Sequence, residues 1–419
     1  MKKLILFITI CILTTSNLFA QIDWVPYEGN PVIDENFDTS APDVSAPNVL
    51  FDGTTYLMWY TRELVEDELA KIGFATSPDG INWTLIDSLA LEPSSDPTRF
   101  DSKIVAARWV IKEGDTLKMW YCGEGAHSDG IGYAWSLNGH NWTKVDGTGM
   151  GRSVYDATMD GSNVVALLTP CVVKDGGAYH MWYSRVCYEE PILFFSLGYA
   201  TSPNGLDWIN VPGPGTNGAV LDLGESGKFD ESWVLYPSVI KENSEFMMWY
   251  TGKSDASGLI RVGYATSNDG INWIKVDGNG TNGACLDESS YSSSVIKIGD
   301  FYHMWYIGVG GMCYATSVGT GIKDFNEGKI STSFSLAQNY PNPFNPTTRI
   351  SYSLPGSEFV SLKVYDINGR EVQTLVSEFQ TVGAYSINFD AKDLTGGIYF
   401  YRLQIGSIFT ETKKMILLR

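Results

Sequence analysis

Six carboxylates in this sequence are placed where they could carry acid and base chemistry. General acid and base catalysis needs two such groups with different environments, so that one holds a proton while the other accepts one. The candidate bases are Asp38, Asp43 and Asp101, and the candidate acids are Glu124, Glu189 and Asp230. If the chain is an enzyme, we expect one residue of each set to act.

Three of these carboxylates recur in the same local sequence, as Phe37-Asp38, Phe100-Asp101 and Phe229-Asp230. A catalytic apparatus is asymmetric, because an acid and a base need different surroundings. Carboxylates that recur at equivalent positions therefore favour a structural role. Their catalytic role stays open as the alternative.

Residues that interrupt the repeated pattern are the better candidates for ligand contacts. Charged and aromatic side chains that converge on a concave surface suit sugar hydroxyls and ring faces. The candidate binding residues are Arg62, Arg108, Trp109, Arg185, Trp233 and Tyr236.

The elements that position these residues are defined by the phrase Met-Trp-Tyr, which occurs five times at intervals of roughly 60 residues, a period typical of repeat architectures. The copies are Met58-Trp59-Tyr60, Met119-Trp120-Tyr121, Met181-Trp182-Tyr183, Met248-Trp249-Tyr250 and Met304-Trp305-Tyr306. The five copies therefore indicate five repeats and their positions along the chain.

Each repeat contains four short strand-like runs, which in the fourth repeat are residues 238–241, 246–250, 262–266 and 273–276. Four antiparallel strands per repeat around a common axis predict an all-β, five-bladed β-propeller over residues 21–330. The fifth repeat lacks its fourth run. We expect the segment around Trp24 to supply that strand and close the ring.

A turn with Asn-Gly or Asp-Gly chemistry joins the third and fourth runs of four repeats. These turns contain Asp79-Gly80, Asn138-Gly139, Asn204-Gly205 and Asp269-Gly270. Turn propensity alone explains them. Antiparallel order places the start of the innermost strands and the loop after Met-Trp-Tyr on the opposite face, which is therefore the expected site.

The composition changes after residue 330. A linker rich in Pro and Asn, residues 331–347, precedes alternating runs that predict a small Ig-like β-sandwich over residues 348–419. This tail resembles the C-terminal sorting domain of type IX secretion cargo proteins. The resemblance lies in residues 339–348, 364–370, 396–399 and 413–415. It implies contact with the type IX secretion machinery and export through the periplasm to the outer cell surface or beyond.

The five repeats themselves resemble the arabinanase, levansucrase and invertase superfamily, especially glycoside hydrolase family 43. The resemblance implies two carboxylates that flank a glycosidic bond and a third that tunes the acid. Where that superfamily has Asp before Pro on an innermost strand, this chain has Ala46-Pro47, Thr169-Pro170 and Tyr236-Pro237. Two hypotheses stay open: a glycoside hydrolase acting on an extracellular polysaccharide, and a glycan-binding or scaffolding propeller that cleaves nothing.

Composition and charge limit the remaining possibilities. Residues 1–20 have the pattern of a signal peptide, with two lysines, an apolar run and Ala20 before Gln21. The net charge of −19 argues against nucleic acid as a partner. None of the five cysteines after residue 20 forms a CxxC pair, and no metal or cofactor is expected. The expected partner is a polysaccharide or another glycan, and the chain is expected to be a monomer.

Overall fold

A computed structural model describes residues 22–317 and 334–418, except 39–42, 65–68, 126–128, 162, 256, 300, 340, 355–357, 381–382, 393 and 407–408. The expected signal peptide and the first residues of the expected linker lie outside this part. Within it, no helix is long and apolar enough to span a membrane. The five cysteines present are all buried free thiols.

The fold is all-β. The part of the chain from β1 to β21 forms five antiparallel sheets. In the first four, the strands follow one another in sequence from the innermost strand outward, and in the fifth the outermost strand is the first strand of the chain. The first sheet contains β2 (Asp43–Phe51), β3 (Tyr56–Leu64), β4 (Leu69–Ser77) and β5 (Thr84–Leu91). The second contains β6 (Ile104–Glu113), β7 (Thr116–Glu124), β8 (Asp129–Ser136), β9 (Thr143–Val145) and β10 (Tyr155–Asp156), which is followed by the short helix α1 (Ala157–Asp160).

The third and fourth sheets repeat this order, and the fifth adds the first strand of the chain at its outer edge. The third contains β11 (Val164–Asp175), β12 (Ala178–Glu189), β13 (Ile192–Ser202) and β14 (Ile209–Asn210). The fourth contains β15 (Trp233–Glu242), β16 (Glu245–Lys253), β17 (Ile260–Ser267) and β18 (Ile274–Val276). The fifth contains β19 (Tyr291–Ile298), β20 (Phe301–Gly308), β21 (Gly311–Ser317) and β1 (Trp24–Pro26).

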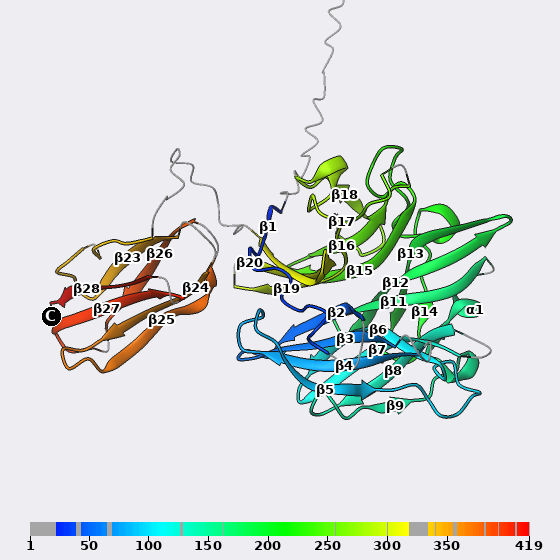
Figure 1. The fold of residues 1–419 in the computed structure, drawn as a ribbon, viewed down its shortest axis with the longest axis horizontal. Coiled ribbons are helices and arrows are strands. Elements are labelled where there is room, and N and C mark those ends of the chain that lie inside the picture. Colours follow the sequence, from blue (N-terminus) through cyan, green and yellow to red (C-terminus); the bar gives the residue numbers. More distant parts are fainter. Residues whose placement is uncertain are drawn as a thin grey trace, which may run out of the picture.

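The five sheets are arranged in a ring (Figure 1). The innermost strands β2, β6, β11, β15 and β19 each contact the next one, and β19 contacts β2. Each sheet therefore packs between two neighbours, and the innermost strands surround a common axis.

The first strand of the chain completes the last sheet. β1 pairs antiparallel with β21, with Trp24 opposite Ser317, so the predicted pairing of the Trp24 segment with the fifth repeat is confirmed. Trp24 also packs edge to face on Trp249 of the fourth sheet, with ring centroids 5.9 Å apart. An exposed strand edge on β21 is thereby covered.

The Met-Trp-Tyr phrase lies on the second strand of every sheet, and its Trp side chains are fully buried. Four of these indoles donate a hydrogen bond to the Gly carbonyl in the turn of the next sheet. The bonds are Trp59 to Gly139 (2.7 Å), Trp120 to Gly205 (2.8 Å), Trp182 to Gly270 (2.8 Å) and Trp305 to Gly80 (2.7 Å). These glycines have φ between 76° and 83°, which a residue with a side chain rarely adopts.

The contact between the fourth and fifth sheets differs, because β1 and β21 of the fifth sheet lie far apart in the sequence and are not joined by such a turn. The Trp249 indole packs on Trp24, but neither Nε1 atom has a hydrogen-bond partner among the described residues. We call this contact between the fourth and fifth sheets the seam. The seam has the same edge-to-face packing of two indoles as the other contacts between sheets, but it lacks their hydrogen bond from indole to Gly carbonyl.

The C-terminal part forms two further antiparallel sheets. One contains β22 (Ser335–Leu336), β23 (Thr347–Leu354) and β26 (Gly383–Asp390), and the other contains β25 (Glu371–Gln380), β24 (Glu358–Tyr365), β27 (Gly397–Ile405) and β28 (Phe409–Leu417). Buried residues from both sheets form one apolar core, separate from those of the ring. In Figure 1 these sheets lie beside the ring, and Phe379 contacts Tyr27 and Tyr314 of the fifth sheet.

Candidate functional site

Each innermost strand has a bulge at the same level along the axis, where its register with the second strand shifts. In four of the five strands a residue other than glycine has positive φ at this bulge: Ala46 (46°), Thr169 (48°), Tyr236 (54°) and Ser292 (52°). Such conformations cost free energy and concentrate at functional sites. The ring of bulges is therefore the first structural indication of a site.

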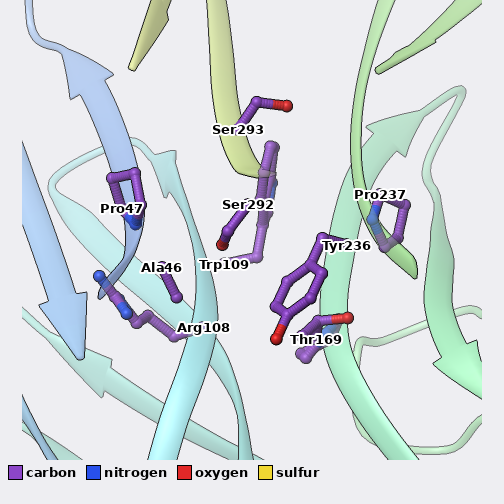
Figure 2. A pocket seen from close by; sticks show the side chains of 10 residues that line it. Ala46, Pro47, Arg108, Trp109, Thr169, Tyr236, Pro237, Ser292 and Ser293 are labelled. Carbon is purple, nitrogen blue, oxygen red and sulfur yellow. The ribbon is translucent and has the colours of Figure 1, made fainter. Parts of the chain in front are cut away.

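The bulges surround a small cavity of about 30 Å³ on the axis, which we call the axial cavity (Figure 2). Its lining residues are Ala46, Pro47, Arg108, Trp109, Thr169, Pro170, Tyr236, Pro237, Ser292 and Ser293. All five innermost strands contribute to it. The three predicted residues Arg108, Trp109 and Tyr236 are thus brought together.

A larger cavity of about 440 Å³, the mouth cavity, shares Ala46, Thr169, Tyr236 and Ser292 with the axial cavity. Its other lining residues are Asp43, Ser45, Thr61, Ile104, Ala106, Cys122, Gly123, Glu124, Asp129, Leu168 and Tyr291. The mouth cavity lies at the start of the innermost strands, which is the face on which the site was expected.

Three carboxylates line the mouth cavity: Asp43, Glu124 and Asp129. Glu124 at the end of β7 lies directly opposite Asp129 at the start of β8, which puts their Cα atoms about 5 Å apart in an antiparallel pair. Burial, and then the negative charge of Glu124, raise the pKa of Asp129. Asp43 comes from β2 in the neighbouring sheet. The cavity therefore contains one carboxyl group with a raised pKa and two more carboxylates in its lining.

The recurring carboxylates lie elsewhere, buried beside the tyrosines of Met-Trp-Tyr. Tyr60 donates to Asp38 (3.1 Å), Tyr121 to Asp101 (2.8 Å) and Tyr250 to Asp230 (2.8 Å). The remaining two sheets use Asp160 with Tyr183 and Glu288 with Tyr306. A hydrogen bond from this tyrosine to a carboxylate thus occurs in every sheet. Such a repeated contact favours a structural role for these carboxylates.

Cations complete these buried contacts. Arg62 binds both oxygens of Asp38, through Nε at 2.5 Å and Nη2 at 3.3 Å. Lys144 binds Asp101 and Lys275 binds Asp230, each at 2.6 Å. Although burial alone would raise it, the Lys144 ammonium and the Tyr121 hydroxyl hold the pKa of Asp101 below its usual range. Asp38, Asp101 and Asp230 are therefore each paired with a cation inside the core.

The other predicted residues are also placed outside the two cavities. Arg185 is buried and forms an ion pair with Asp160 at 2.9 Å. Glu189 is exposed at the end of β12 and accepts a hydrogen bond from Asn217. Trp233 packs on Phe195, and the Lys253 ammonium lies over its ring at 4.1 Å from the centroid.

Sequence reasoning missed Asp129. The candidates from sequence lie in the loop directly after Met-Trp-Tyr, whereas Asp129 is the first residue of the next strand. The pairing of β7 with β8 brings it opposite Glu124. The signal for it is the hairpin register, because Tyr121 opposite Gly132 places Glu124 opposite Asp129. Within the described ranges, no group of three or more His, Cys, Asp or Glu side chains is placed to hold a metal ion.

Comparison with known proteins identifies the C-terminal part. Residues 338–418 match the family model of the secretion system C-terminal sorting domain. This confirms the resemblance of the tail to a sorting domain and indicates export to the cell surface or the extracellular space. The sorting domain also implies contact with the secretion machinery.

The chain is also similar to proteins of known structure and to a relative in another organism. An uncharacterized protein of Mycobacterium tuberculosis is 29% identical over 234 residues, which are 53% of this chain and 69% of that protein. A structure described under the GH130 family of mannoside phosphorylases is 17% identical, with a TM-score of 0.52, and the match covers 72% of this chain and 95% of that one. A β-1,2-mannobiose phosphorylase from Listeria innocua is 14% identical, with a TM-score of 0.52, and that match covers 71% of this chain and 96% of the phosphorylase.

A glycosyl hydrolase from Bacteroides ovatus is 16% identical, with a TM-score of 0.53 and coverage of 72% of this chain and 95% of that one. At these identities the matches show a shared propeller-type fold. They do not single out glycoside hydrolase family 43, so the narrower resemblance expected from the sequence is not supported.

Proposed function

We propose that this protein is a secreted five-bladed β-propeller that cleaves a glycosidic bond in an extracellular glycan. The five sheets are its blades, residues 1–20 its signal peptide and residues 348–419 an Ig-like sandwich used for sorting. The matched structures described as glycoside hydrolases and mannoside phosphorylases support a carbohydrate ligand. The observation that carries the proposal is the set of three carboxylates around the mouth cavity.

The chemistry follows from the different surroundings of these carboxylates. Asp129, with its raised pKa, donates a proton to the oxygen of the leaving sugar. Glu124 keeps that pKa raised by its charge, since two neighbouring carboxylates resist ionising together. Asp43, on the neighbouring sheet, acts as the base or nucleophile. In this arrangement Glu124 tunes the acid instead of being the acid.

The test is a glycan screen with the full-length chain and the variants Asp129→Asn, Glu124→Gln and Asp43→Asn. Asp129→Asn and Asp43→Asn are each expected to lower the cleavage rate by about 100-fold or more, the usual contribution of an acid or base. Glu124→Gln is expected to lower the rate at neutral pH through the pKa of Asp129. Glu189→Gln is the matched control, because Glu189 is an exposed carboxylate that does not line the mouth cavity. Cleavage that survives all three substitutions would contradict the proposed roles.

Water and phosphate are both possible acceptors for the released sugar, because hydrolases and phosphorylases are both among the matched structures. Running the screen with and without inorganic phosphate separates the two reactions, since only phosphorolysis yields a sugar phosphate.

Glycan binding without cleavage is the second candidate function. It is favoured by the bulges themselves, because the strained residues Ala46, Thr169, Tyr236 and Ser292 carry no carboxylate. Retention of a glycan by the wild-type chain, with no product released from it, would support this second function and exclude the first.

A further inference from the structure

Neighbouring sheets of the ring are joined by ion pairs at the ends of their innermost strands, on the face away from the mouth cavity. Counted from the residue opposite the Trp of Met-Trp-Tyr, the third residue onward is Lys in four sheets, and the residue after it is acidic in four. Each Lys belongs with the acidic residue of the preceding sheet. The pairs are Lys112 with Asp52 by position, and by contact Lys174 with Glu113 at 2.9 Å, Lys241 with Asp175 and Lys297 with Glu242.

The junction of the fifth and first sheets departs from this rule at both positions. The fifth sheet has Ile298 where the others have an acid, and the first sheet has Phe51 where the others have Lys. Phe51 packs on Tyr56, with ring centroids 4.7 Å apart, and Tyr56 packs on Trp305 of the fifth sheet at 5.7 Å. An apolar and aromatic surface therefore replaces the ion pair at this junction.

A pair of tyrosines lies beside this surface, on the strands that close the ring. The backbone N–H of Tyr27, the residue after β1, donates to the Tyr314 carbonyl of β21 at 2.8 Å. The Asn30 side chain also binds the backbone of Tyr314, donating to its carbonyl at 3.0 Å and accepting its N–H at 2.8 Å. These bonds hold the two tyrosine rings 6.4 Å apart at an angle of 65°.

Phe379 of β25 packs against both tyrosines. Its ring lies 6.0 Å from Tyr27 and 6.2 Å from Tyr314, in each case edge to face at 78°, which is a favoured arrangement of aromatic rings. Phe379 packs on the core shared by the first and fifth sheets and not on the core of the C-terminal sheets. In Figure 1 the ends of β24 and β25 are the part of the C-terminal sheets nearest the ring.

The carboxylates beside Phe379 act on tyrosines from both ends of the ring. Burial, and then the charge of Glu358, raise the pKa of Tyr27. Burial, and then the charges of Asp79 and Glu378, raise the pKa of Tyr56 in the first sheet to about 12. The β24–β25 hairpin therefore lies over the whole junction and not over the fifth sheet alone.

We propose that the junction of the first and fifth sheets is a docking surface for the sorting domain of the same chain, and that this domain docks only on a closed ring. The surface combines the segment after β1 with β3 and β21, and these meet only when the last sheet packs on the first. A chain whose ring is open therefore presents an undocked sorting domain to the secretion machinery. This proposal does not depend on the proposed cleavage.

The first test is small-angle X-ray scattering of the full-length chain with Phe379→Asp, which puts a third carboxylate beside Glu358 and Glu378. The radius of gyration is expected to increase, because the C-terminal sheets keep their own core but leave the ring. Ile367→Asp is the matched control, since Ile367 is an exposed residue in the turn at the other end of the β24–β25 hairpin. An unchanged radius of gyration in Phe379→Asp would overturn the proposal.

Thermal unfolding followed by tryptophan fluorescence tests the dependence on closure. A domain that docks only on the closed ring must stabilise that ring. Phe379→Asp is therefore expected to lower the melting temperature of the ring by about 2 °C or more, although the substitution lies outside the ring. A ring that melts at the wild-type temperature while its C-terminal sheets are released would show that docking does not depend on closure.

A double variant, Phe51→Lys with Ile298→Glu, tests the surface from the side of the ring. It installs the ion pair of the other junctions and leaves Phe379 unchanged. The ring is expected to fold and the C-terminal sheets to be released, as in Phe379→Asp. Sheets that remain docked in a folded double variant would contradict the assigned surface. A wild-type dimer that the double variant abolishes would instead assign the junction to a second copy of the chain and overturn the proposal.

Discussion

Two kinds of carboxylate occur in this protein, those buried against cations and those that line a cavity. Asp101 accepts hydrogen bonds from Tyr121 and Lys144 and is fully buried, whereas Glu124 and Asp129 line a cavity. A buried ionised carboxylate is stable only while its partners remain. A carboxyl group whose pKa is raised by a like charge is instead prepared to exchange a proton.

The role proposed for Asp129 makes the cleavage rate depend on pH. Asp129 must be protonated to act as an acid, so the cleavage rate falls as pH rises through its pKa. Because the charge of Glu124 helps to raise that pKa, Glu124→Gln should lower it and move the alkaline limb of the pH–rate profile to lower pH. The profile of kcat/KM measures the shift. An alkaline limb that stays in place in Glu124→Gln would contradict the pairing.

The structural role of Asp101 leads to a stability prediction. Asp101→Asn removes the charge that Lys144 and Arg99 face, and breaking a buried pair in this way is expected to cost about 3–5 kcal/mol of unfolding free energy. Urea unfolding measures this cost, with Asp115→Asn in an exposed turn as the control. Equal stability of the two variants would be inconsistent with a structural Asp101.

At the scale of elements, sheets are joined by the contact between an indole and a turn. The Gly270 carbonyl accepts from Trp182 of the third sheet at 2.8 Å and from Trp273 of its own sheet at 2.9 Å. The Asp269 carboxylate in turn accepts the backbone N–H groups of Ile271 and Asn272, which fixes the turn. The turn of the fourth sheet therefore has a fixed shape, and it accepts a hydrogen bond from the second strand of the third sheet.

The seam allows this hydrogen bond to be measured by comparison. Trp182→Phe and Trp249→Phe remove similar apolar volume from fully buried sites, but only Trp182 donates a hydrogen bond. Trp182→Phe is expected to be more destabilising by about 0.5–1.5 kcal/mol, the net value of one hydrogen bond. Denaturant unfolding of the two variants gives the difference. A Trp249→Phe variant that loses as much as Trp182→Phe would mean that the seam has a bond of equal strength.

The sequence predicted these elements because burial imposes a regular pattern on strands. Met-Trp-Tyr and the turns recur wherever a sheet must pack between two others, and the missing fourth run pointed to Trp24. The site was less predictable because bulges on the innermost strands change the direction of side chains locally. Arg108, Trp109, Tyr236, Asp43 and Glu124 were found as departures from the repeat. Asp129 was not, since its position depends on strand register.

At the scale of the whole molecule, a ring of sheets and a separate pair of sheets share one chain. All 13 tryptophans precede residue 318, so tryptophan fluorescence reports on the ring alone. The C-terminal sheets have a core of their own and contact the ring through Phe379. The two parts can therefore be followed separately during unfolding.

Removing the closing contact should weaken the ring and spare the C-terminal sheets. Trp24→Ala is expected to cost the ring about 3–5 kcal/mol, the usual effect of truncating a buried Trp. Tryptophan fluorescence and far-UV circular dichroism during urea unfolding follow the ring and the whole chain. Trp135→Ala, at a more exposed indole, is the control. Unchanged ring stability in Trp24→Ala would show that β1 does not hold the ring closed.

The pairing of β1 with β21 also fixes when the molecule can finish folding. Trp24 is among the first of these residues to be synthesised, and its partner Ser317 is made only after the other four sheets are complete. Contacts between such distant residues carry a large loop-closure entropy and form slowly. Until then the nascent chain is an open arc whose first strand has no partner, so any factor that captures this strand early would keep the ring from closing.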